Sequence, residues 1–220
     1  MKYELAMNLL MFICSLFGTV YGLSEFFKKK KAVYLKLVTC GVMSLMFSRL
    51  YQVIYLLTQG ALNTGFHIGI LGIIGSFMFF FSANFGQMDS LVDDKTKTFR
   101  KTRILSFAAP LFILLIYLFF FLNVQNTELK IVYGIVTLFI MQSAYYCFKH
   151  VIIYDVEFGI VKCLRKYNIL ALVYAVSSML EPIGLHLGIT PLYIVSCVIT
   201  ALVAAALLPV LKGGAQKWTI

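Results

Sequence analysis

The stretch ILALVYAVSSMLEPIGLHLGITPLYIVSCVITALVAAALLPV, residues 169–210, decides the fold of this chain. It holds two apolar runs of about 20 residues, the length that a helix needs to cross the hydrocarbon core of a bilayer. The pattern recurs along the chain and predicts an all-α membrane protein with seven transmembrane helices. The expected spans are 5–27, 33–58, 65–87, 104–123, 130–153, 168–188 and 191–211.

The composition agrees with a chain that lies mostly in lipid. Hydrophobic residues make up 61% of the 220 residues and charged residues 13%, and the mean hydropathy is +0.90. Soluble domains are about 45–50% apolar and about 25% charged. No polar segment exceeds about 20 residues, which leaves no room for a separate soluble domain. We therefore expect residues 1–220 to form one seven-helix transmembrane domain.

The basic residues set the expected orientation. The loops after the first, third and fifth spans and the tail hold Lys28–Lys31, Lys36, Lys95, Lys97, Arg100, Lys101, Arg103, Lys149, Lys162, Arg165, Lys166, Lys212 and Lys217. The opposite side has only Lys2 and Lys130. Because cytoplasmic loops carry the Lys/Arg excess, the N-terminus is expected outside and the C-terminus inside a multi-pass cell-membrane protein. The first run lacks a small-x-small cleavage site and leads into KKKK, so we expect it to be retained.

Several function classes find no support in the sequence. The net charge of +10 comes from short loops between apolar runs, which indicates topology rather than nucleic-acid binding. Cysteines at 14, 40, 147, 163 and 197 show no CxxC spacing, and the three histidines form no metal motif. No GxSxG or HExxH motif occurs. We expect no enzyme activity, no metal and no cofactor.

Two opposite charges lie inside the predicted spans. Arg49 and Glu181 each lie about 12 residues past the inner end of their span, so both are expected about 18 Å into the membrane. Intramembrane charges are costly and usually face the bundle interior with a partner. The equal depth therefore predicts an Arg49–Glu181 pair if the second and sixth spans are neighbours. Such a pair either fixes the helix register or also lines a binding site.

Polar side chains at three- and four-residue spacing flank these charges on the second, fifth and sixth spans. The candidate ligand-binding residues are Arg49, Glu181, Gln52, Tyr55, Ser178, Tyr174 and Gln142. Pro182 frees a backbone carbonyl next to Glu181 and is a candidate hinge. His67 and His186 lie near the outer ends of their spans and are candidates for a pH-responsive gate, although two histidines without function are the favoured interpretation. Gly65, Gly69, Gly72 and Gly75 predict a helix-packing face.

Two cytoplasmic segments leave alternatives open. Residues 156–168 are either an interfacial helix or, as we favour, an extension of the neighbouring spans. Asp89, Asp93 and Asp94 follow the third span and either balance the next basic loop or form a cytoplasmic gate. The outer loops 58–64, 124–128 and 188–190 are all short, which excludes a large extracellular domain.

The number and direction of the spans resemble those of two families. One comprises the sugar-exporting transporters with a three-plus-one-plus-three repeat, and the other the rhodopsin-type receptors. The first resemblance implies a parallel repeat joined by the very apolar fourth span. The Pro-Gln dipeptide typical of those transporters is missing, and the seventh span has no mid-membrane lysine for a retinal Schiff base.

The leading hypothesis is a transporter of a small polar or charged solute bound near Arg49 and Glu181. The rival hypothesis is a seven-helix receptor or sensor. Its small-molecule ligand would enter from outside among Tyr55, Gln59, His67 and His186. Its basic inner loops would then bind a cytoplasmic protein partner. A third class is an accessory subunit of a larger complex.

Overall fold

The computed structural model describes residues 2–27, 32–62, 65–89, 93, 96–153 and 160–216. Within these ranges every regular element is a helix. The elements are α1 Lys2–Phe26, α2 Val33–Gln59, α3 Ile68–Ala83, the π-helix η1 Asn84–Asp89, the 3₁₀-helix η2 Lys97–Phe99, α5 Arg100–Leu105, α6 Ala108–Asn123, α7 Thr127–Ile152, α8 Ile160–His186 and α9 Thr190–Gln216. Seven of the helical stretches are long and apolar enough to cross a membrane, which confirms the expected fold class.

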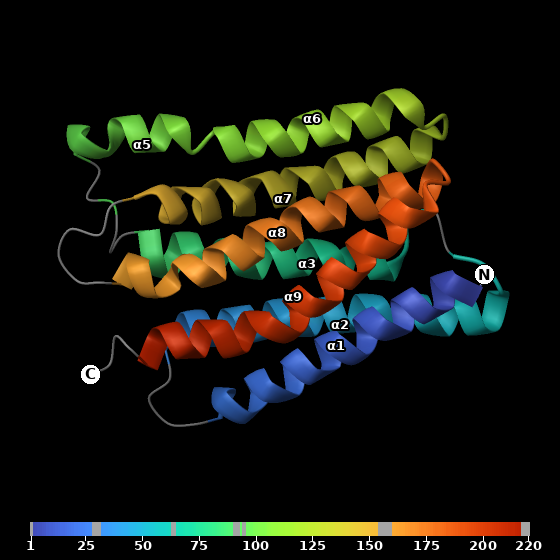
Figure 1. Cartoon of the computed structure of the whole chain (residues 1–220), viewed down its shortest axis with the longest axis horizontal. Helices are drawn as coiled ribbons and strands as arrows, with labels where there is room; N and C mark the ends of the chain where they lie inside the picture. The colour runs from blue at the N-terminus through green and yellow to red at the C-terminus, as the bar shows by residue number, and fades with distance from the viewer. Residues whose placement is uncertain are drawn as a thin grey trace.

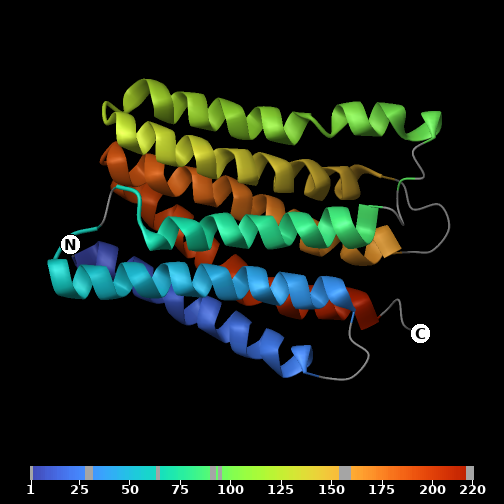
Figure 2. The same cartoon turned by 180° about the vertical axis from the view of Figure 1, so that it is seen from behind.

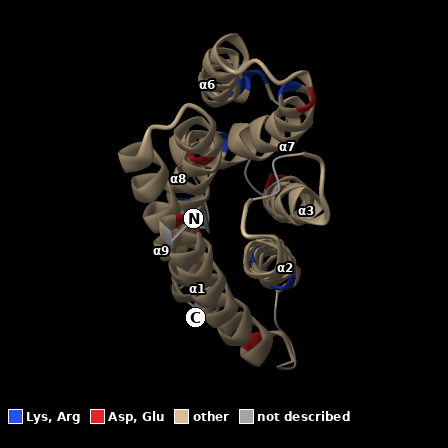
Figure 3. Cartoon of the chain, turned by 90° about the vertical axis from the view of Figure 1, so that its right-hand side faces the viewer, with Lys and Arg blue, Asp and Glu red and all other residues tan. Residues whose placement is uncertain are grey.

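Six of the seven spans form a ring, and the remaining one lies outside it (Figure 3). Around the ring the helices follow chain order, α1, α2, α3, α7, α8 and α9, and α9 closes on α1. Helix α6 packs mainly against the outer surface of α7 and α8. Its span is the least buried of the seven, as expected for a helix that is apolar on every side. A linker between two three-helix units would occupy this place, but the repeat itself stays a prediction.

The two ends of the bundle differ in what they carry. The N-terminus and the α2–α3, α6–α7 and α8–α9 connections lie at one end, here called the N-terminal end (Figure 1). Helices α1, α3 and α7 end, and α2 and α8 begin, at the other end, the C-terminal end, where α5 and the end of α9 also lie (Figures 1 and 2). The helix ends that flank the basic segments of the sequence therefore lie at the C-terminal end. The direction of the bundle in a membrane stays a prediction from the Lys/Arg distribution.

The fourth span is broken near the C-terminal end of the bundle, where we expected one helix over 104–123. Helix α5 ends at Leu105, and α6 begins at Ala108 after a turn at Ser106 and Phe107. Pro110 explains the break, because a proline has no N–H for the carbonyl four residues earlier and its ring clashes with that carbonyl. The carbonyl concerned is that of Ser106, the first residue of the turn.

Two further helices differ from their expected ranges. Helix α3 begins only at Ile68, because His67 is extended, so Gly65 lies in the preceding connection and not on the glycine face. Gly72 and Gly75 do pack on Ser44 of α2. Helix α8 begins at Ile160, well before the expected span, which confirms over 160–168 that this segment extends the sixth span. Residues 156–159 lie outside the described part of the chain.

Candidate functional site

Arg49 and Glu181 form a two-pronged ion pair inside the ring. Nη1 of Arg49 donates to Oε1 of Glu181 at 2.5 Å, and Nη2 donates to Oε2 at 2.6 Å. The Arg49 side chain is 4% exposed and that of Glu181 14%. This fork geometry uses both carboxylate oxygens at once and is the strongest arrangement available to these two groups.

The pair joins two helices that are not neighbours. Arg49 belongs to α2 and Glu181 to α8, and these helices are separated in the ring by α3 and α7 on one side and by α1 and α9 on the other (Figure 3). We expected pairing if the two helices lay side by side. Instead, the charges meet across the interior of the ring, so the pair occupies the middle of the bundle and not a helix–helix seam.

A small polar cavity of about 40 Å³ borders the ion pair. The volume has room for about three water-sized groups. Its walls come from α1, α2, the α2–α3 connection, α3, α7, α8 and α9. The lining residues are Asn8, Ser48, Arg49, Gln52, Leu62, His67, Ile70, Ile73, Tyr133, Glu181, Leu185, His186 and Tyr193.

Hydrogen bonds fix the wall of the cavity between α2 and α3. Ser48 donates to the backbone carbonyl of Gly69 at 2.7 Å, and Gln52 Nε2 lies 2.8 Å from His67 Nε2. The His67 ring also stacks on Tyr51, with ring centroids 5.2 Å apart. His67 is thus held in place at the N-terminal end of the cavity, and its role in a gate stays a prediction.

Two tyrosines complete the cavity and were not among the predicted site residues. Tyr193 of α9 accepts a hydrogen bond from Asn8 at 3.2 Å, and Tyr133 of α7 lies beside His186, with ring centroids 6.0 Å apart. Tyr193 reaches the cavity because Gly184 lets α9 approach α8 closely. Each is an aromatic ring in a mostly apolar run, where the sequence does not distinguish a ring that packs from a ring that lines a cavity.

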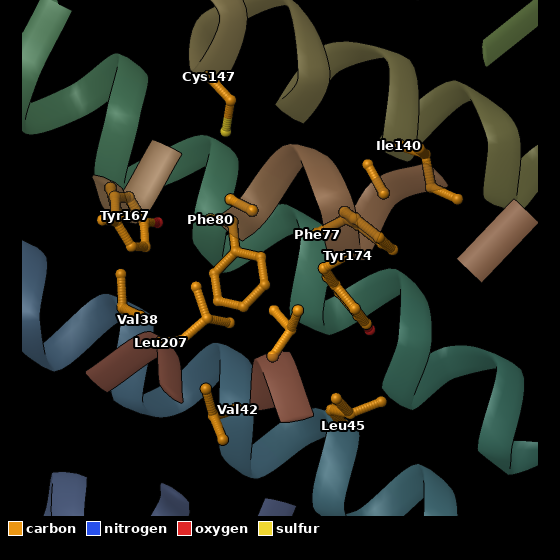
Figure 4. Close-up of a cluster of buried hydrophobic side chains, with 14 of the residues drawn as sticks. Val38, Val42, Leu45, Phe77, Phe80, Ile140, Cys147, Tyr167, Tyr174 and Leu207 are labelled. Carbon is orange, nitrogen blue, oxygen red and sulfur yellow. The ribbon is translucent and has the colours of Figure 1, made fainter. Parts of the chain in front are cut away.

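An aromatic cluster is buried in the ring interior (Figure 4). It lies nearer the C-terminal end than the ion pair does, because Tyr174 precedes Glu181 on α8. Tyr174 of α8 stacks on Phe77 of α3 with ring centroids 4.7 Å apart, and it meets Phe80 edge-on at 5.9 Å. All three rings are at most 1% exposed. The Tyr174 hydroxyl lies beside those of Ser76 and Ser178. We call Phe77, Phe80 and Tyr174 the aromatic plug, because they fill the ring interior.

Other predicted site residues lie away from the cavity. Gln142 is exposed and lines an apolar groove beside α6, so the structure does not bring it to the cavity. Tyr55 stacks on Tyr51 and does not line the cavity. Pro182 is buried, and α8 continues through it without interruption. Its role as a hinge stays a prediction.

A second charge cluster lies at the C-terminal end of the bundle. Lys149 of α7 contacts Asp89 at 2.6 Å and Asp93 at 2.7 Å, while His150 lies 3.4 Å from Asp89. Arg103 pairs with Asp93 at 3.0 Å, as expected for an acid that balances the following basic loop. Burial alone would raise the pKa of Asp89, but hydrogen bonds from His150 and Lys149 hold it below its ordinary value. Asp94 lies outside the described residues.

Neither a known relative nor a metal-binding cluster indicates what the site does. No protein family, curated protein or solved structure matches the chain. Among the described residues, no group of three or more His, Cys, Asp or Glu side chains could hold a metal ion. The chemistry of the site therefore rests on one charge pair and a set of neutral hydrogen-bonding groups.

Proposed function

We propose that the protein is a membrane transporter of a small charged solute, which binds in the cavity beside Arg49 and Glu181. The observation that carries the proposal is an ion pair at the wall of a polar cavity inside a seven-helix bundle. A charged pair inside a membrane is costly, and such residues mark solute pathways in many membrane proteins. Binding sites near the bilayer midplane are typical of transporters.

The aromatic plug supplies the barrier that a transporter needs. It separates the cavity from the C-terminal half of the ring interior, where Val38 and Leu207 lie beside it (Figure 4). A solute bound at Arg49 can pass toward the C-terminal end only if the stacked rings of Phe77 and Tyr174 separate. In a transport cycle, this conformation would be the one that is closed toward the C-terminal end.

Helix α8 connects the binding site to the barrier. Glu181 and Tyr174 are seven residues apart on α8, so they lie on the same face about two turns from each other. A movement of α8 that opens the ion pair therefore also shifts the Tyr174 ring. Pro182 follows Glu181 directly and weakens the backbone ladder at that place. This coupling gives α8 the role of the moving element.

Net uptake into liposomes tests the proposal. Radiolabelled formate, glycine and choline represent an anion, a zwitterion and a cation, and glucose is the neutral control. We expect one of the three charged solutes to accumulate faster than in protein-free liposomes, and Glu181→Gln to abolish this net uptake. The matched control is Glu25→Gln, which removes another buried carboxylate that pairs with Lys212 at 2.9 Å, away from the cavity. Uptake of none of the three charged solutes, or of glucose alone, would contradict the proposal.

A second candidate function is a sensor, and one observation favours it. Lys149, Asp89 and Asp93 tie the ends of α3 and α7 together, the two helices that also border the cavity. A ligand in the cavity could thereby change the surface presented at the C-terminal end. Binding of a solute with no net uptake by the same preparation would favour this function over transport.

A further inference from the structure

The ion pair limits which charged ligand the proposed site can accept. Arg49 and Glu181 neutralise each other, and both prongs of the guanidinium are occupied by the carboxylate. A ligand ion added to the intact pair would leave one net charge in a water-poor interior, which is strongly unfavourable. The pair must therefore change its charge before a singly charged ligand can bind.

Only one member of the pair can change its charge. A guanidinium is not deprotonated in proteins, whereas a carboxylate can take up a proton. Protonation of Glu181 would leave Arg49 as an unpaired cation with a planar fork of donors. Such a fork matches the oxygens of a small anion and does not match a cation.

The surroundings of the pair favour the same ligand. The titratable groups that act electrostatically on Glu181 are Arg49 of α2, Tyr133 of α7, Tyr174 of α8, and Tyr193 and Cys197 of α9. His67 and His186 also line the cavity. Among the described lining residues Glu181 is the one carboxylate, so an ammonium group of a zwitterion would have no further acidic partner.

The unused donor of Arg49 adds an independent observation. Arg49 is 3% exposed, and its Nε has no hydrogen-bond partner among the described residues. Buried polar groups without partners are rare in folded proteins and call for a bound water or ligand. The cavity has room for about three water-sized groups next to this side chain.

We propose that the site binds a small monovalent anion, and that it does so only when Glu181 carries a proton. The site then takes up one anion and one proton together and stays neutral. Re-forming the Arg49–Glu181 pair expels the anion as the proton leaves. The proposal rests on the proposed function for its place in a transport cycle, where it implies symport of an anion with a proton.

Calorimetric titration of the purified full-length protein tests the binding step. Sodium formate and sodium nitrate serve as probes, because both are small, and glycine as the zwitterion, in two buffers that differ in ionisation enthalpy. We expect each bound anion to bring about one proton above neutral pH, and its affinity to fall about tenfold per pH unit as the pH rises. The control Glu25→Gln should behave as the wild type does.

The variants separate Glu181 from the histidines. Glu181→Gln imitates the protonated carboxyl, so it should bind the anion with no proton uptake and with an affinity that no longer depends on pH. Arg49→Gln should lose binding. Proton uptake that persists in Glu181→Gln would assign the proton to His67 or His186 and overturn the proposal. The proton count on the unmodified protein decides the question even if a variant fails to fold.

The remaining outcomes distinguish this inference from the proposed function. Anion binding without proton uptake, binding of glycine in place of both anions, or binding of neither anion under acidic conditions would overturn the inference. Anion binding with proton uptake but no net uptake into liposomes would leave the inference standing and remove the transport function. Net solute uptake without proton binding would leave the transport function standing and overturn the inference.

Discussion

At the scale of single residues, the Arg49–Glu181 pair makes a double-mutant cycle informative. Removal of one partner leaves a buried charge without compensation, which costs about 3–5 kcal/mol. We expect Arg49→Gln and Glu181→Gln each to lower the free energy of unfolding, and the double variant to cost about 2 kcal/mol less than the sum of the two. Reversible unfolding in SDS titrations of detergent-solubilised protein measures these values. Strictly additive effects would show that the two side chains do not interact.

Asp89 gives the protein a predicted acid sensitivity. Its pKa in the folded protein lies below the ordinary value of 3.8, so the folded state binds its proton less readily than the unfolded state does. The stabilisation is therefore complete above the unfolded pKa and is lost as the pH falls through the folded pKa. We expect Asp89→Asn to lower the melting temperature at about pH 6 and to reduce its fall toward about pH 3. Equal acid sensitivity of the variant and the wild type would exclude this role.

At the scale of elements, the contact between α8 and α9 shapes the cavity. A Cβ added at Gly184 would lie 2.7 Å from the Cα of Tyr193, and backbone atoms cannot move aside as side chains do. We expect Gly184→Ala to destabilise the protein by about 2 kcal/mol through overpacking and to displace Tyr193 from the cavity. Thermal unfolding together with anion titration measures both effects.

Gly213 provides the control on the same helix pair. A Cβ added there meets no atom within 4 Å, so Gly213→Ala should leave stability unchanged or slightly higher, because alanine favours a helix. A similar loss of stability in both variants would mean that an added methyl group destabilises the bundle without regard to the close approach of α8 and α9.

The sequence predicted the number of membrane spans and the contact between the two intramembrane charges. The seven spans follow from apolar length, and the meeting of Arg49 with Glu181 follows from their equal depth. Tyr133 and Tyr193 could not be found in this way, because an aromatic ring in an apolar run is equally suited to packing. Gln142 lies away from the cavity, because a polar stripe on one helix does not tell which side of that helix faces the ring interior.

The sequence did not predict the local backbone conformation at the end of α3 either. The π-helical end of α3 at Asn84–Asp89 has no sequence signature, although π-helical turns are often found at functional sites. This turn carries Asp89 to Lys149 and Asn84 to Cys147, whose Sγ accepts from Asn84 Nδ2 at 3.1 Å. Both contacts join α7 to the end of α3, and the sequence does not show that these two helices lie side by side.

At the scale of the whole molecule, the order of the ring and the distribution of basic residues make orientation testable. The Lys/Arg excess predicts that the α6–α7 connection faces outward and that α5 faces the cytoplasm. On intact cells, a membrane-impermeant maleimide should therefore label an Asn126→Cys variant and spare a Lys101→Cys variant. The reverse labelling pattern would show the opposite orientation in the membrane and would exclude access to the cavity from outside.

The central claim is that the Arg49–Glu181 pair is the working centre of the bundle and not only a fastening between α2 and α8. The exchange of the two charges, Arg49→Glu with Glu181→Arg, tests this claim most directly. The exchanged pair can still neutralise itself, so we expect a folded protein with a melting temperature near that of the wild type. Net solute uptake should be lost, because the cation now lies on the other wall of the cavity. Uptake at the wild-type rate by the exchanged variant would contradict the account.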